Sequence, residues 1–113
     1  MVSEKRSYKL TVTLDLHWKQ GNDYEAKVSV QTTDSCFHPV ELKQGLPPDT
    51  VGIPETAYLT FTFTHDENKV CSDLVKTVEK TITISFSAEK TKVTAFAVVN
   101  GVTAGSATKD FPR

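Results

Sequence analysis

The sequence predicts an all-β domain built from two packed antiparallel sheets, and three features indicate this class. Runs of alternating polar and apolar residues recur along the 113 residues, each of strand length. An Asn-Gly pair separates two β-rich runs near the C-terminus. No segment carries a convincing long helical period. The chain is of the size of one ordinary domain, so we expect residues 1–113 to form a single domain.

The first two elements form a predicted hairpin. Residues 8–18 alternate strictly, and residues 24–30 resume the alternation after a short polar loop. If Trp18 pairs with Tyr24, the two apolar faces lie on the same side. A slip of one residue would bury Asp15 and Lys27, so the pattern itself fixes the register. The apolar positions are Tyr8, Leu10, Val12, Leu14, Leu16, Trp18, Tyr24, Ala26, Val28 and Val30.

Two further strands are predicted at residues 57–64 and 81–87. Their inward positions are Ala57, Leu59, Phe61 and Phe63 in the first, and Ile82, Ile84 and Phe86 in the second. Between them, Val70, Leu74 and Val78 recur at helical spacing. The intervening segment is therefore expected to form either a short helical turn or a loop with a satellite contact.

The chain ends in a second predicted hairpin around Asn100 and Gly101. Both residue types tolerate positive φ, as a type I′ turn of two residues requires. In that register Val99 lies opposite Val102. Phe96 then lies opposite Gly105 and covers the residue that has no side chain.

Six such strands resemble the two-sheet architecture of immunoglobulin-like or fibronectin type III-like domains, with a small Greek-key barrel as the alternative. The resemblance is one of architecture alone. Trp18 precedes both cysteines, so the Cys-Trp-Cys order of immunoglobulin domains is absent. No ligand residue can therefore be carried over from those families.

Composition limits the partners. A formal charge of -1 and a pI near 6.3 leave no excess of basic residues for phosphates, so no nucleic-acid partner is expected. No apolar run approaches the roughly 20 residues of a membrane span. The nucleophile, nucleotide and metalloprotease motifs are missing from the sequence, so we expect neither an enzyme nor a cofactor.

The two cysteines support two hypotheses. A Cys36–Cys71 disulfide is typical of an extracytoplasmic protein, periplasmic or secreted. Alternatively, Cys36, His38, His65 and Cys71 are zinc ligands in type and number, although their spacing is not that of a zinc finger. The N-terminus, MVSEKRSYKL, has no apolar signal-peptide core. The protein is therefore cytoplasmic, or the chain begins after a cleavage site. The cysteine pair favours the second alternative, so we predict an extracytoplasmic location, periplasmic or secreted.

Residues 35–56 interrupt the alternation with four prolines and no clear hydrophobic period. A long loop stiffened by proline loses less entropy on binding, so this segment is the predicted contact surface. The candidate contacts are Phe37, His38, Leu46, Pro47, Pro48 and an outward-facing Tyr58. The structural alternative is an edge strand followed by a lid, with Val40, Leu42, Leu46, Val51 and Ile53 packed on the sandwich.

The sequence thus predicts a non-catalytic binding module for a protein or carbohydrate, present as a monomer or weak homo-oligomer. A metal-binding protein and an assembly subunit that pairs through a sheet edge remain alternatives. Trp18 and Tyr24, at the mouth of the first hairpin, are expected to cap the end of the core.

Overall fold

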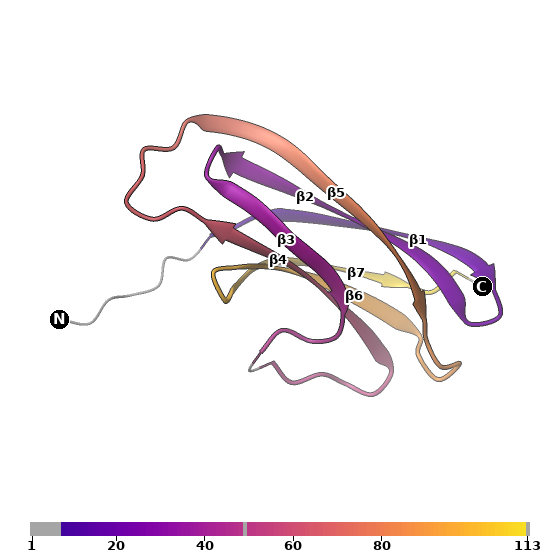
Figure 1. Cartoon of the computed structure of the whole chain (residues 1–113). Helices are drawn as coiled ribbons and strands as arrows, with labels where there is room; N and C mark the ends of the chain where they lie inside the picture. The colour runs from indigo at the N-terminus through magenta and orange to yellow at the C-terminus, as the bar shows by residue number, and fades with distance from the viewer. Residues whose placement is uncertain (1–7, 49, 113) are drawn as a thin grey trace.

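The computed structural model describes residues 8–48 and 50–112, and these form two sheets packed face to face (Figure 1). The strands are β1 (Thr11–Gln20), β2 (Asp23–Asp34), β3 (Phe37–Gln44), β4 (Thr56–His65), β5 (Asp73–Ser85), β6 (Lys92–Val99) and β7 (Val102–Asp110). Neither described range contains a helix. The predicted two-sheet sandwich is confirmed. The N-terminal segment considered for a signal peptide lies almost entirely outside the described residues.

The three-stranded sheet has the order β1-β2-β5. Its β1–β2 hairpin has the predicted register, with Trp18 opposite Tyr24 and Leu14 opposite Val28. Leu14, Ala26, Val28 and Val30 are all buried, whereas Asp15 and Lys27 pair with each other on the outer face. Alternation was sufficient to set the register of this hairpin, because a slip of one residue would move its apolar face away from the core.

The four-stranded sheet has the order β3-β4-β6-β7, and its central pair, β4 and β6, runs parallel. The prediction of antiparallel pairing throughout was therefore wrong for this pair. After β4 the chain crosses to the other sheet as β5 and returns as β6 in the direction of β4, which makes the pair parallel. The assignment to an immunoglobulin-like or fibronectin type III-like family remains a prediction.

Strand β5 begins at Asp73, where the sequence left open a helical turn or a loop. The first half of the strand pairs with β2 as far as Asp34, opposite Asp73. Backbone pairing along nearly the whole of β2 outweighs the helical spacing of Leu74 and Val78, in a segment rich in β-branched residues. The face of β5 near its start stays open, because Leu74 remains half exposed.

The second hairpin turns at Asn100 and Gly101, whose φ angles are 49° and 82°. Val99 lies opposite Val102 as predicted. The predicted contact between Phe96 and Gly105 is wrong, because a bulge shifts the register and places Ala97 opposite Gly105. The bulge leaves the Ala104 carbonyl to accept a hydrogen bond from the Leu10 amide at 2.9 Å, which joins the N-terminal segment to β7.

Gly105 lies where the chain before β1 crosses β7, and a Cβ added there would collide with the Leu10 carbonyl oxygen. We expect Gly105→Ala to lower the free energy of unfolding by about 1 to 3 kcal/mol, because backbone must move to admit the methyl group. Urea denaturation measures this loss. Ser106→Ala, at an exposed neighbouring position, is the control and should change stability by less than about 0.5 kcal/mol. Equal stabilities of the two variants would contradict the close approach.

Candidate functional site

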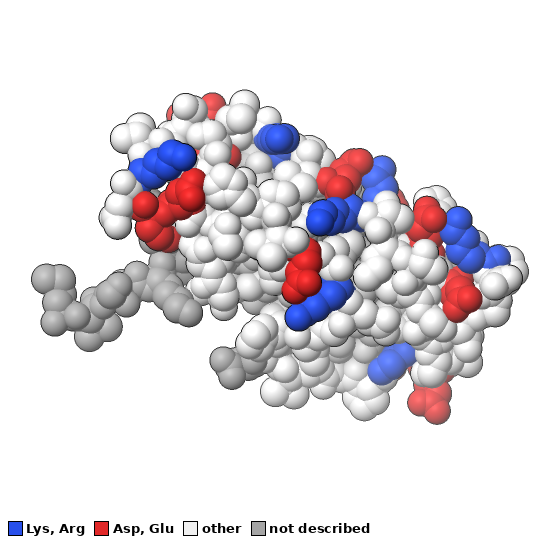
Figure 2. All heavy atoms as spheres, viewed as in Figure 1, with Lys and Arg blue, Asp and Glu red and all other residues white. Residues whose placement is uncertain are grey.

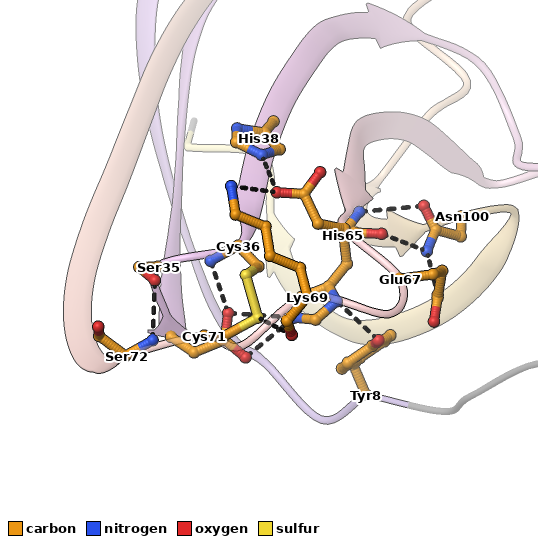
Figure 3. Close-up of polar contacts among 12 residues, drawn as sticks. Tyr8, Ser35, Cys36, His38, His65, Glu67, Lys69, Cys71, Ser72 and Asn100 are labelled. Carbon is orange, nitrogen blue, oxygen red and sulfur yellow. Dashed lines mark hydrogen bonds and ion pairs between the residues drawn. A yellow bond between two sulfur atoms is a disulfide. The ribbon is translucent and has the colours of Figure 1, made fainter.

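A disulfide joins Cys36 to Cys71 at one end of the sandwich (Figure 3), as predicted. Cys36 directly precedes β3 in the four-stranded sheet, and Cys71 lies just before β5 in the three-stranded sheet. The bridge therefore connects the two sheets, with 5.6 Å between the Cα atoms. It spans 35 residues, and a loop of that size corresponds to about 4 kcal/mol of entropic stabilisation in the chain-entropy model.

Because Cys36 and Cys71 form the disulfide, neither offers a thiol to the predicted metal site. His38 also lies apart from the other three residues predicted for that site. His38 Nε2 instead contacts the Asp66 carboxylate at 2.8 Å, with Lys69 also near that carboxylate (Figure 3). The hydrogen bond with His38, followed by the charges of His38 and Lys69, lowers the pKa of Asp66 below its usual value. These side chains are exposed, so their ion pairs contribute little to stability.

His65 is buried beside the disulfide, and its main partner is a residue that the sequence did not single out. Its Nε2 lies 2.9 Å from the Asp34 carboxylate, and its Nδ1 lies 2.9 Å from the Tyr8 hydroxyl. Only 2% of the His65 side chain is exposed. Asn100 holds the backbone of His65 through two hydrogen bonds, one in each direction. The ring is thereby fixed in one orientation by three separate parts of the chain.

Asp34 ends β2 and has a second role in the corner that leads to β3. One of its carboxylate oxygens accepts the Cys36 amide at 2.8 Å, in the manner of an Asx turn. The sequence Asp-Ser-Cys after a β-rich run was the signal available for this turn. Its partnership with His65 was not visible, because the two residues are 31 positions apart.

The irregular part of residues 35–56 is shorter than predicted. Residues 37–44 form β3, which confirms the edge strand of the structural alternative. Pro39 is tolerated because β3 lies at the edge of its sheet and bulges between Pro39 and Glu41. The remaining residues 45–55, here called the 45–55 loop, connect β3 to β4, and the structure describes residues 45–48 and 50–55 of it, because Asp49 lies outside the described residues.

The six predicted contact residues separate into two groups. Phe37 and His38 start β3, next to the disulfide, and Phe37 is buried against the rings of Tyr8 and His65. The others belong to the 45–55 loop or to the strand beneath it, and these are Leu46, Pro47, Pro48 and Tyr58. Among them Pro47 is buried, Pro48 is exposed, and Leu46 and Tyr58 are partly buried. The structure therefore does not bring the predicted contacts together into one surface.

The 45–55 loop folds back over the outer face of β4, and Tyr58 is its main support. The Tyr58 hydroxyl accepts the Ile53 amide at 2.9 Å, and the Tyr58 carbonyl accepts the Gly45 amide at 2.8 Å. A Cβ added at Gly52 would lie only 2.6 Å from the Tyr58 ring, so this residue must be small for the loop to close. Yet Val51 is 94% exposed and Ile53 is 53% exposed. The loop is firmly anchored but directs two apolar side chains into water.

At the opposite end of β2 from the disulfide lies an aromatic cleft of about 520 Å³. It is lined by Trp18, Asn22, Tyr24, Phe86, Ser87, Ala88, Lys90, Phe111 and Pro112. Trp18 is 58% exposed, and its indole nitrogen donates to the Gly21 carbonyl at 2.9 Å, which fixes the ring. Trp18 and Tyr24 were predicted only to cap the core. Phe111, which packs on Tyr24 with 4.6 Å between the ring centroids, was not predicted from the sequence.

Lys90 connects the cleft to the 45–55 loop. It lines the cleft, and its ammonium group donates to the Pro54 carbonyl at 2.6 Å. The Thr91 amide also donates to Glu55 at 2.8 Å. The loop and the cleft are therefore neighbours at one end of the sandwich, away from the disulfide. On the face shown in Figure 2, basic and acidic side chains of the described residues are interspersed rather than segregated.

Comparison with protein-family models, with curated proteins and with solved structures finds no match. Across residues 8–48 and 50–112 there is no helix of the length and apolarity needed to cross a membrane.

Proposed function

We propose that this protein is a non-catalytic binding module that presents the 45–55 loop to a protein partner. The observation that carries the proposal is the exposure of Val51 on a loop held by hydrogen bonds to Tyr58, Thr60 and Lys90. A loop that is held near both of its ends loses less conformational entropy on association than a free one. Apolar side chains held in water on such a loop then bind by transfer into a partner's pocket.

The contact surface we propose is narrower than the one predicted from sequence. It consists of Leu46, Pro48, Val51 and Ile53. Phe37 and His38 lie at the other end of β3, at the start of an extended strand that ends just before the loop. Tyr58 supports the loop from below, so it acts on binding by positioning Ile53 rather than by contact.

Location and oligomeric state are further parts of the proposal. The Cys36–Cys71 bridge supports an extracytoplasmic location, where disulfides persist. Two of the four edge strands, β3 and β5, support a monomer rather than an assembly subunit. Strand β3 contains Pro39 and a bulge. Strand β5 has Lys76 on its inner face, which elsewhere in the strand points to the core. A proline, a bulge or an inward-facing charge at a sheet edge hinders pairing with a strand of another molecule.

The first test replaces the two exposed apolar side chains of the loop. The partner is identified by photo-crosslinking from position 51 in the native cells, and its affinity for purified variants is then measured by calorimetry. Val51→Ser combined with Ile53→Ser should weaken binding by about 10- to 100-fold, since two buried side chains lose their transfer energy. The melting temperature should not change, because both side chains are exposed.

Val70→Ser is the matched control, since Val70 is 96% exposed but lies in the β4–β5 connection near the disulfide. It should bind as the unaltered protein does. Binding that is lost in Val70→Ser and retained in the double variant would contradict the assignment of the contact surface to the 45–55 loop.

A second candidate function is carbohydrate binding in the aromatic cleft. The fixed and exposed indole of Trp18 offers a flat apolar face, and Asn22 and Ser87 supply amide and hydroxyl groups at the cleft wall. Sugar rings bind to protein through this combination of ring stacking and hydrogen bonds. The volume of about 520 Å³ lies in the range of small-ligand sites.

Trp18 is the only tryptophan of the chain, so its fluorescence reports directly on the cleft. Titration with a panel of methyl pyranosides and N-acetylhexosamines should shift or quench the emission with saturation for at least one sugar. Asn22→Ala should lower the affinity for that sugar by about 5- to 10-fold, which corresponds to the loss of one hydrogen bond. Thr13→Ala, on the exposed face of β1, should not change it. Emission that stays constant across the panel would exclude this second function.

A further inference from the structure

We propose that the reduced form of this chain binds one zinc ion between Asp34, Cys36, His65 and Cys71. One ligand atom from each of these residues lies within 4.8 Å of the other three. This set differs from the one predicted from sequence, because Asp34 takes the place of His38. The inference concerns the end of the sandwich opposite the 45–55 loop and does not depend on the proposed binding function.

The four side chains offer two sulfur atoms, one imidazole nitrogen and one carboxylate oxygen, which are donors that zinc accepts in tetrahedral sites. With bonds of about 2.3 Å to sulfur and about 2.0 to 2.2 Å to nitrogen and oxygen, neighbouring ligand atoms lie about 3.3 to 3.8 Å apart. No separation in the structure exceeds 4.8 Å. Two are shorter than a zinc site requires, that between the two bonded sulfur atoms and the 2.9 Å between His65 Nε2 and the Asp34 carboxylate. Reduction lets the sulfur atoms move apart, and side-chain rotation adjusts the other distances. Two thiolates favour zinc over calcium or magnesium.

The site requires reduction of the disulfide, for which a dithiol is the reductant. The dithiol transfers two electrons and two protons to the bridge. The sulfur–sulfur bond breaks, Cys36 and Cys71 become thiols, and the dithiol becomes a disulfide. Zinc binding then releases the two thiol protons to solvent and leaves both sulfurs as thiolates bound to the ion.

His65 already has an arrangement that suits a metal ligand. Its Nε2 faces the Asp34 carboxylate and its Nδ1 faces the Tyr8 hydroxyl. To bind zinc through Nε2, the neutral ring carries its proton on Nδ1 and donates it to the Tyr8 oxygen. A second hydrogen bond of this kind fixes the orientation of most histidines that bind metals. Burial of His65 and Cys36 limits the access of competing water.

Zinc and the disulfide would then be alternative cross-links of the same two segments. Each joins the residue before β3 to the residues before β5, and each therefore closes the same loop of the chain. The consequence is that reduction need not separate the two sheets when zinc is present. The residues before β3 and before β5 would stay cross-linked in either kind of compartment, by the disulfide in an oxidising one and by zinc in a reducing one.

The test uses cobalt as a spectroscopic probe for zinc on the full chain. Protein reduced with a phosphine under anaerobic conditions should bind one cobalt ion per chain. It should develop the thiolate-to-cobalt charge-transfer band and the intense visible bands of tetrahedral cobalt, and zinc should displace both. The oxidised protein should show neither. Failure of the reduced chain to bind cobalt, or equal binding by the oxidised chain, would overturn the proposal.

Two variants identify the ligands. Asp34→Asn should weaken cobalt binding by at least about 10-fold, because it replaces a charged ligand with a neutral one. His38→Ala is the matched control, a nearby histidine outside the set, and should leave the affinity unchanged. The reverse result, with loss in His38→Ala alone, would overturn the assignment.

X-ray absorption of the unaltered zinc-loaded protein needs no variant and should show two sulfur and two nitrogen or oxygen neighbours. Circular dichroism follows the fold in parallel. If the reduced chain unfolds, zinc should restore the strand spectrum, and a chain that stays unfolded with zinc would contradict the proposal.

Discussion

The covalent link between Cys36 and Cys71 is the constraint on which the closed end of the sandwich depends. Near this end a hollow of about 300 Å³ lies between β5 and β3, and Leu74 is half exposed beside it. The first half of β5 is held by pairing with β2 and by the bridge. The buried contact of Asp34 with His65 adds a polar connection between the same two sheets.

The bridge and the surfaces proposed for binding lie at different ends of the sandwich. Figure 1 shows the β2–β3 corner and the β4–β5 connection at one end, and the β1–β2 turn at the other. The aromatic cleft and the 45–55 loop, joined through Lys90, lie away from the bridge. The exposed apolar side chains of the 45–55 loop have little effect on the free energy of unfolding, because they are not part of the hydrophobic core. The proposed contact surface therefore lies away from the cross-linked corner.

How much the sequence predicts depends on whether the governing interaction is local. The register of the first hairpin was predicted to the residue, because a slip would bury Asp15 and Lys27, although its strand ends were not. The start of β5 was missed because its partner, β2, is about 40 positions away and the local spacing also fits a helix. The parallel pairing of β4 with β6 depends on a crossover between sheets that no local pattern records. Asp34 was missed for the same reason, since its role depends on His65.

Hydrogen exchange with and without the bridge tests the central claim, that the disulfide closes one end without supporting the other. In reduced and metal-free protein, the amides of Ser35 and Asp66 should lose protection, since their acceptors are Ser72 and Cys36 at the bridged corner. The Gly45 amide, which donates to Tyr58 under the 45–55 loop, should keep its protection. Equal loss of protection at both ends would contradict the account, as would unchanged exchange at the corner.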